Sequence, residues 1–451
     1  MARWKPSAVT GLLALGLGMS VAPAAMGASA STRGGFQLEE ATIAEIQPAI
    51  RRGRLTTTEI VEGYLERIKA YNGTCVNEPE GILGPISTIP NAEKLNALIT
   101  LNLRPETREK WGFDERKARS QTDDADDDPD MPDALEVAAQ LDAKFKRTRH
   151  LAGPLHGVVI AIKDQYDTVD MRTTSGADAF WANDRPPDDA TFIARLREAG
   201  AIILAKANMG EYAAGGMTGT RSMFFDPSLV PHTGAGQPSI RNLGDRGGDS
   251  GDARFNYDMY IRERGDAEIK SLTDLIEKAN HWTDAAIPNR KASLESANDD
   301  MTLSTGSALQ DRFTMQTVVF QCFALMELHA VVYPTGNIPP PILTSPELPS
   351  VNDRPSSIWT QINRSGFPAM TVPAGFTTRV YDAGPDRKIL PPKAAALPVG
   401  IDFLGLPFSE PTLFEIGAAY EAATRHRTPP PGFGPLEGRT SKPDGRGATA
   451  R

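Results

Sequence analysis

The chain has 451 residues, of which 40% are hydrophobic and 23% charged, and its formal net charge is -9. These values are typical of a globular protein with a sizeable core. The negative charge excludes nucleic acid and anionic membrane surfaces as expected partners, because both repel an acidic protein.

The first thirty residues have the pattern of a secretory signal peptide. Arg3 and Lys5 give a positive start, residues 9–22 are apolar or small, and residues 28–30 form an Ala-Ser-Ala cleavage site. An uncleaved membrane anchor is the alternative interpretation, but the apolar run is short for a membrane span. We therefore expect residues 1–30 to be removed on export to the periplasm or the exterior, with no membrane attachment afterwards.

Two cysteines, Cys75 and Cys322, exclude a disulfide-rich scaffold. A single bridge between them is one interpretation. The other places Cys322 in a core helix and leaves Cys75 as a loop thiol. Nothing in the sequence shows that the two approach each other, so their pairing stays open.

Two helices open the mature chain. A capping box at residues 42–45 predicts a helix that ends at Gly53. A second capping box at residues 56–59 predicts a helix that ends at Asn72-Gly73, with apolar residues at helical spacing.

The next part of the chain, residues 73–133, is less regular. It contains a strand-like run at residues 95–100 and an acidic patch at residues 123–130. The patch lacks the glycine and the final glutamate of an EF-hand loop, so a calcium site is disfavoured. We expect a solvated loop instead.

A strand–helix–strand unit follows a predicted helix over residues 132–147. Residues 157–162 are a continuous apolar run, which is typical of a strand buried on both faces. Asp189 is the expected cap of a helix over residues 192–199, and residues 201–204 form a second apolar strand. This spacing predicts a βαβ unit of a mainly parallel sheet.

Residues 224–265 show no clear periodicity and are rich in Gly, Asp, Pro and Arg. Beyond them the pattern predicts helices over residues 272–281 and 304–328, strands over 331–333, 369–372 and 399–404, and a helix over 412–424 capped by Ser409. We expect a single α/β domain over residues 31–435 with an irregular junction at 224–265. Residues 436–451 are predicted to be a disordered tail.

Lys163 follows directly on the buried strand at residues 157–162. One interpretation is that its side chain simply turns into solvent where the strand leaves the sheet. The other is a partly desolvated amine that accepts a proton. Residue type alone favours the first.

A series of short motifs around Lys163 carries a resemblance to a known family. The series is Gly-Pro-Leu-His-Gly at 153–157, Lys-Asp at 163–164, Thr-Thr-Ser-Gly at 173–176, Asp-Asp-Ala at 188–190, Leu-Arg-Glu-Ala-Gly-Ala at 196–201 and Lys-Ala-Asn-Met-Gly-Glu at 206–211. Together these motifs closely resemble the N-terminal part of amidase signature enzymes. Residues 331–337, 366–375 and 397–404 resemble closing strands of the same family. The likeness covers residues 38–435 apart from the middle.

The resemblance implies hydrolysis of the carboxamide C–N bond of a small-molecule amide. Family members use a lysine, a bridging serine in a cis peptide and a nucleophilic serine, and backbone N–H groups hold the oxyanion. Lys163 matches the family's lysine and is therefore the expected general base. The implied fold is a mixed, mainly parallel central sheet flanked by helices.

The chain departs from the family in its middle. Neither the glycine-serine-rich signature expected after residues 215–225 nor the Gly-Gly-Ser-Ile-Arg stretch is present. This predicts an internal deletion, a sheet truncated in the middle and impaired catalysis. The alternative hypothesis is a non-catalytic scaffold that retains part of an amide-binding cleft.

Three serines are candidate replacements for the missing nucleophile. Ser239, in Pro-Ser-Ile-Arg at 238–241, is a weak echo of the family motif and is otherwise an ordinary loop serine. Ser222 and Ser175 have no glycine-rich loop to supply oxyanion donors. Without these parts Lys163 has nothing to activate. Asp164 is interpreted as the ion-pair partner of Lys163 or as a strand-end charge.

No motif points to a cofactor or a metal. The six histidines have no metal-ligand spacing, and no Walker or Rossmann glycine pattern is present. The absence of a G-x-S-x-G elbow argues against an α/β-hydrolase. The expected partner is a small-molecule amide, and the oligomeric state is open.

Overall fold

The computed structural model describes the chain in thirteen segments. They are residues 36–72, 76–77, 87–88, 97–120, 124–176, 185–209, 253–279, 291–299, 306–336, 366–380, 390–430, 433–434 and 436. The predicted signal peptide and tail, Cys75, Ser222 and Ser239 lie outside the described residues. The predictions made for them, and the division into domains, stay predictions.

The first two helices begin at the predicted capping boxes. In α1 (Ile43–Arg51) the Glu45 carboxylate accepts a hydrogen bond from the Thr42 N–H at 2.8 Å. In α2 (Thr57–Tyr71) the Glu59 carboxylate accepts one from the Thr56 N–H at 2.8 Å. Each box satisfies backbone donors that the first turn of a helix leaves unpaired.

The N-terminal sheet has the strand order β3-β5-β4. Strands β4 (Val159–Lys163) and β5 (Ile202–Ala207) run parallel and are joined through α5 (Thr191–Glu198), so the βαβ prediction is confirmed. Strand β3 (Leu98–Leu101) runs antiparallel to β5, which makes the sheet mixed. Helices α2 and α4 (Ala134–Thr148) share one apolar core with β3 and β5.

Two details of this unit differ from the prediction. The N-cap residue of α5 is Ala190, and no side chain caps the helix. Asp189 accepts instead from the Val169 N–H at 2.9 Å and pairs with Arg197 at 2.9 Å, because it faces the preceding loop. Strand β4 is the edge of the described sheet, so it is only partly buried, and Ala161 is exposed.

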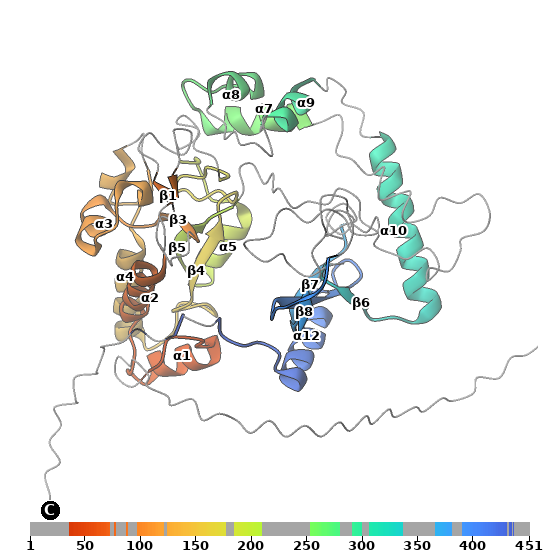
Figure 1. Cartoon of the computed structure of the whole chain (residues 1–451). Coiled ribbons are helices and arrows are strands. Elements are labelled where there is room, and N and C mark those ends of the chain that lie inside the picture. The colour runs from red at the N-terminus through yellow and green to blue at the C-terminus, as the bar shows by residue number, and fades with distance from the viewer. Residues whose placement is uncertain are drawn as a thin grey trace, which may run out of the picture.

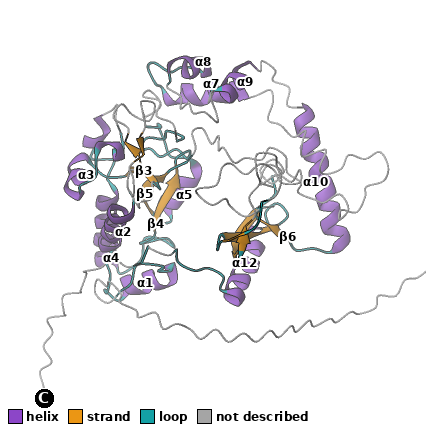
Figure 2. Ribbon diagram, in the orientation of Figure 1, coloured by secondary structure: helices purple, strands orange, loops and turns teal. Residues whose placement is uncertain are grey.

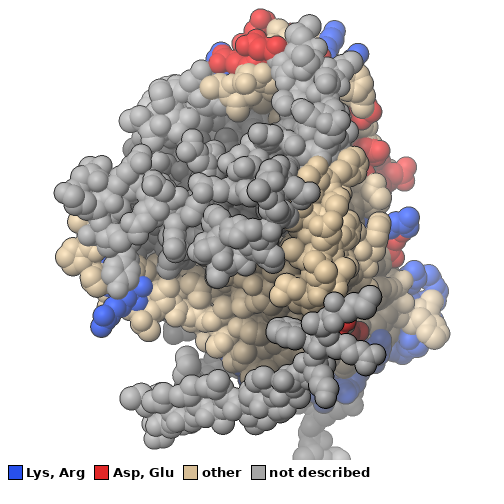
Figure 3. Space-filling view, turned by 90° about the vertical axis from the view of Figure 1, so that its right-hand side faces the viewer, with Lys and Arg blue, Asp and Glu red and all other residues tan. Residues whose placement is uncertain are grey.

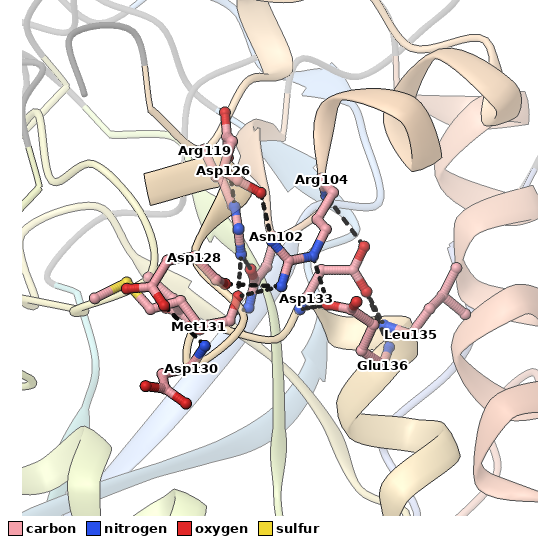
Figure 4. Close-up of polar contacts among 11 residues, drawn as sticks. Asn102, Arg104, Arg119, Asp126, Asp128, Asp130, Met131, Asp133, Leu135 and Glu136 are labelled. Carbon is pink, nitrogen blue, oxygen red and sulfur yellow. Dashed lines mark hydrogen bonds and ion pairs between the residues drawn. The ribbon is translucent and has the colours of Figure 1, made fainter. Parts of the chain in front are cut away.

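The acidic patch is exposed at Asp127 and Asp130, as expected of a solvated loop, and two arginines bind its backbone and Asp126 (Figure 4). It forms the short 3-10 helix η2 (Asp124–Asp127) and the turn after it. Arg119 Nε lies 2.6 Å from Asp126 Oδ1, and Arg104 donates to the Asp128 carbonyl at 2.9 Å. Helix α3 (Pro105–Trp111) and the 3-10 turn η1 (Glu115–Lys117), which were not predicted, lie between these arginines in the chain.

The C-terminal sheet has the order β6-β10-β7 and is antiparallel. It consists of β6 (Val331–Pro334), β7 (Ala369–Phe376) and β10 (Pro398–Leu404). Leu404 packs with α10 (Gly306–Met326), whereas Phe403 packs with α12 (Glu410–Thr424). Because adjacent strand residues point to opposite faces, the two helices cover opposite faces of this sheet. Ser409 is the N-cap of α12 as predicted, but its side chain makes no capping bond.

The stretch expected to be irregular, residues 224–265, contains a helix, so that prediction is wrong for residues 253–264. Helix α7 (Ala253–Arg264) packs with α8 (Leu272–Lys278) and α9 (Ala292–Asp299) around a small apolar cluster. The periodicity of α7 is weak because Ile261 is its one residue that is both described and buried. The short strand pairs β1 (Val76–Asn77) with β2 (Ser87–Thr88), and β8 (Arg379–Val380) with β9 (Lys393–Ala394), complete the elements.

Figures 1 and 2 show the two three-stranded sheets as separate bodies of strand, with α7, α8 and α9 along the top. The predicted α/β class with mixed sheets and flanking helices is confirmed, although β4 and β5 form the one parallel pair among the described ladders. After α12 the chain returns to the N-terminal unit, where Arg427 pairs with Glu40 at 2.7 Å.

Cys322 is a half-buried free thiol. Among the described helices, none combines the length and apolarity that crossing a membrane requires.

Candidate functional site

The carboxyl ends of β4 and β5 meet at one edge of the N-terminal sheet. Lys163 is the last residue of β4 and lies opposite Ala207 of β5. Ligands of α/β sheets commonly bind outside the carboxyl ends of parallel strands. The Lys163 side chain is exposed there, and no described residue accepts a hydrogen bond from its ammonium group.

Asp164 turns away from Lys163 into the protein and is fully buried. Its carboxylate accepts from the Thr174 hydroxyl at 2.5 Å and from the Gly176 N–H at 2.9 Å. Its carbonyl accepts from the Ser175 N–H at 2.9 Å. Asp164 therefore fixes the turn at residues 173–176 and is not the ion-pair partner of Lys163.

The buried lysine of this edge is Lys206, on β5, which the sequence analysis did not single out. Its ammonium donates to the Tyr166 carbonyl at 2.6 Å and to the Thr173 hydroxyl at 2.7 Å. Burial lowers the pKa of Lys206 to about 8, and the nearby Asp164 opposes that shift. The burial of Lys206 could have been inferred from the sequence, because this lysine continues an apolar strand.

Helix α7 reaches this edge through two polar side chains. The Tyr260 hydroxyl donates to Asp167 Oδ1 at 2.8 Å. Arg264 Nη1 donates to the Tyr260 hydroxyl at 3.1 Å and to the Thr173 carbonyl at 3.4 Å. Burial raises the pKa of Tyr260 to about 12, so its hydroxyl stays a donor at neutral pH.

A cavity of about 190 Å³ lies between α7 and the 173–176 turn. Ser175 lines it from a left-handed backbone conformation with φ +55°. Of the three candidate serines, Ser175 alone lies within the described residues, and the structure places it beside Asp164 rather than in a glycine-rich loop. Within the described part of the chain, no cluster of three or more His, Cys, Asp or Glu side chains is arranged to hold a metal ion.

Sequence comparison links one segment of the chain to a known family. The family model for amidases matches residues 120–233, a segment that contains Lys163, the 173–176 turn and Lys206. Residues 120–233 therefore resemble the amidase family. It is also similar to a subunit of the glutamyl-tRNA(Gln) amidotransferase of Alkaliphilus metalliredigens, with 31% identity over 183 residues, which are 41% of this chain and 27% of that protein. The corresponding subunit of the Moorella thermoacetica amidotransferase is 46% identical over 93 residues, 20% of this chain and 18% of that protein.

Solved structures of amidases share the fold of this chain. The native peptide amidase from Stenotrophomonas maltophilia superposes with a TM-score of 0.53 and 19% identity, over 87% of this chain and 98% of that one. An amidase family protein from Bacillus anthracis superposes with a TM-score of 0.51 and 16% identity, over 87% and 92%. The predicted amidase signature fold is thereby confirmed. In sequence, the chain matches only about a quarter or less of the length of the two amidotransferase subunits.

Proposed function

We propose that this amidase-family chain descends from a carboxamide C–N hydrolase and that its own hydrolytic activity is impaired. Lys163 is its proposed general base, at the carboxyl end of β4. The relatives support an amide as the substrate class, since their names specify a peptide amidase and part of a glutamyl-tRNA(Gln) amidotransferase. A small-molecule amide is the proposed ligand.

The observation that carries the proposal is the exposed Lys163 ammonium without a hydroxyl partner among the described residues. Nucleophilic catalysis needs a hydroxyl within hydrogen-bond reach of the base, and donors for the oxyanion. The sequence has neither the glycine-serine-rich signature nor the Gly-Gly-Ser-Ile-Arg stretch of the family. An internal deletion that removed both is the proposed cause.

Carboxamide turnover by the purified chain tests the proposal. We expect ammonia release from acetamide, benzamide and an amidated dipeptide at the level of a Lys163→Ala variant. Turnover that Lys163→Ala abolishes would refute impaired catalysis. If such turnover is found, its loss in a Ser239→Ala variant of the otherwise wild-type chain, but not in Ser222→Ala, would assign the nucleophile to Ser239.

The cavity beside the 173–176 turn favours a second candidate, a non-catalytic scaffold that binds amides. In that case calorimetry would detect amide binding without turnover.

Export is a separate proposal that rests on Arg3, Lys5 and the apolar residues 9–22. N-terminal sequencing of the protein recovered outside the cytoplasm tests it, and a mature start near residue 31 is the expected result.

A further inference from the structure

His156 is fully buried in the loop that leads into β4, where helices of the N-terminal unit meet. This loop, residues 152–157, contacts α1 through Gln47, whose side-chain amide donates to the Pro154 carbonyl at 2.7 Å. The imidazole also lies beside α4, with its ring centre 6.1 Å from that of Phe145. The loop and two helices are therefore in contact around this one residue.

The two ring nitrogens of His156 have different partners. Nδ1 accepts a hydrogen bond from the Ala152 N–H at 3.1 Å. Because a backbone N–H can only donate, Nδ1 carries no proton, and the single proton of the neutral ring lies on Nε2. Nε2 faces the hydroxyl oxygen of Thr57, in the first turn of α2, at 3.4 Å. These contacts require a neutral imidazole.

The charged groups that act on the ring come from α4. Asp142 favours the protonated imidazole and Lys144 opposes it, whereas α1 and α2 meet His156 with the uncharged side chains of Gln47 and Thr57. The Asp142 carboxylate is bonded to the Thr57 N–H at 2.7 Å, at the start of α2. Burial outweighs the attraction of Asp142 and lowers the pKa of His156 from its ordinary value of 6.5.

A second proton on His156 would break the contact with the loop. It would place an N–H at Nδ1 directly against the Ala152 N–H, and two donors cannot bond to each other. It would also leave a positive charge in a fully buried position, where charge is costly. The protonated ring is therefore compatible only with a form in which the loop and the helices have moved apart.

We infer that His156 is an acid-sensitive latch that holds α1 and α2 on the N-terminal sheet at neutral pH and releases them in acid. The open form takes up the proton that the closed form excludes, so acid shifts the equilibrium toward release. Above pH 6.5, the ordinary pKa of the ring, neither form binds the proton and the latch contributes fully. The latch involves neither Lys163 nor an amide, so this inference and the proposed function can fail independently.

Hydrogen exchange of the full chain, followed by mass spectrometry, tests the latch. Protection factors are corrected for the intrinsic exchange rate at each pH, and α12 in the C-terminal part serves as the internal reference. Between about pH 7.5 and about pH 5 we expect the protection of α1 and α2 to fall by about three- to 30-fold relative to α12. The upper limit corresponds to a closed form that excludes the proton completely. Unchanged protection of α1 and α2, or an equal fall in α12, would overturn the inference.

Two variants assign the response to this ring. His156→Asn places a carbonyl oxygen near the position of Nδ1, so it can accept from the Ala152 N–H without titrating. Between the same pH values its protection of α1 and α2 should change by less than about two-fold relative to α12. His150→Asn, at an exposed position just before the loop, should keep the wild-type response. A response in His156→Asn as large as that of the wild type would contradict the latch.

Discussion

The N-terminal unit, residues 36–209, and the C-terminal part, residues 306–430, each build a three-stranded sheet with helices, yet they bury it differently. In β5, the centre of the first sheet, five of six residues are buried. In β10, the centre of the second sheet, three of seven are buried. The central strand of the first sheet is thus almost fully buried, whereas that of the second is buried at one end and mostly half-buried at the other.

The exposed apolar side chains show the same contrast. Among the described residues of the N-terminal unit, the large exposed apolar ones are Ile43, Tyr166 and Phe192. Among those described in the C-terminal part, they are Phe313, Phe320, Leu325, Met326, Val332, Phe376, Leu390, Phe408 and Phe414. Figure 3, which faces the α10 side of Figure 1, shows a broad uncharged expanse with charged side chains at its rim. Apolar surface of this kind is costly in water. The better-buried unit also contains most of the segment that matches the amidase family.

A matched pair of leucines gives the largest expected difference between the two regions. Leu65 is 0% exposed in the N-terminal core, and Leu325 is 85% exposed on α10. Leu65→Ala should lower the free energy of unfolding by about 2–5 kcal/mol, because it removes buried contacts and leaves a cavity. Leu325→Ala should change it by less than about 0.5 kcal/mol. Urea denaturation followed by circular dichroism measures both, and equal losses would remove the contrast.

A second expected difference is in how stability depends on pH, and it comes from the buried Lys206. In the folded protein burial lowers the pKa of Lys206 from 10.5 to about 8. Between these pH values the unfolded chain binds the proton that the folded chain has lost, so the free energy of unfolding rises with pH. The whole contribution is roughly 3 kcal/mol, since one pKa unit corresponds to about 1.4 kcal/mol.

Lys206→Met should therefore flatten the stability profile between pH 8 and about 10.5, whereas Lys163→Met, at an exposed position, should keep it. Subtracting the variant profile from the wild-type profile removes the contribution of the tyrosines, which titrate near the same pH. Parallel profiles for wild type and Lys206→Met would contradict the burial of this ammonium.

Two helix caps give the smallest expected difference. Asp133 caps α4 by accepting from the N–H groups of Leu135 and Glu136, both at 2.9 Å. Ser409 occupies the same position before α12 without a capping bond. Asp133→Ala should lower the free energy of unfolding by about 1–2 kcal/mol, and Ser409→Ala by less than about 0.5 kcal/mol. Thermal unfolding measures both, and a larger loss in Ser409→Ala would reverse the comparison.

Local signals predicted the N-terminal elements well. The capping boxes begin α1 and α2 as expected, and the apolar runs predicted β4, β5 and their parallel pairing. Helix α7 was missed because its burial follows from contacts with α8 and α9 rather than from a strong stripe of its own. Asp189 was assigned to a cap because the sequence cannot show that Arg197 and the Val169 N–H attract its carboxylate.

The candidate site was predicted in part. The motif series located Lys163 and the 173–176 turn, because both lie within one contiguous family segment. The burial of Asp164 and Lys206 was not predicted, because it depends on how the 173–176 turn folds back onto the strand ends. The cavity could not be predicted for the same reason, since the residues that line it, such as Ser175 and Arg264, are far apart in sequence.

Labelling with a fluorophosphonate probe tests most directly whether the proposed base, Lys163, has a hydroxyl to activate. The probe reacts with activated serines, so the amount of labelled protein reports a working relay. We predict labelling of the native chain no higher than that of the heat-denatured chain and unchanged in Lys163→Ala. A single labelled serine in the native protein, lost in Lys163→Ala, would contradict the account.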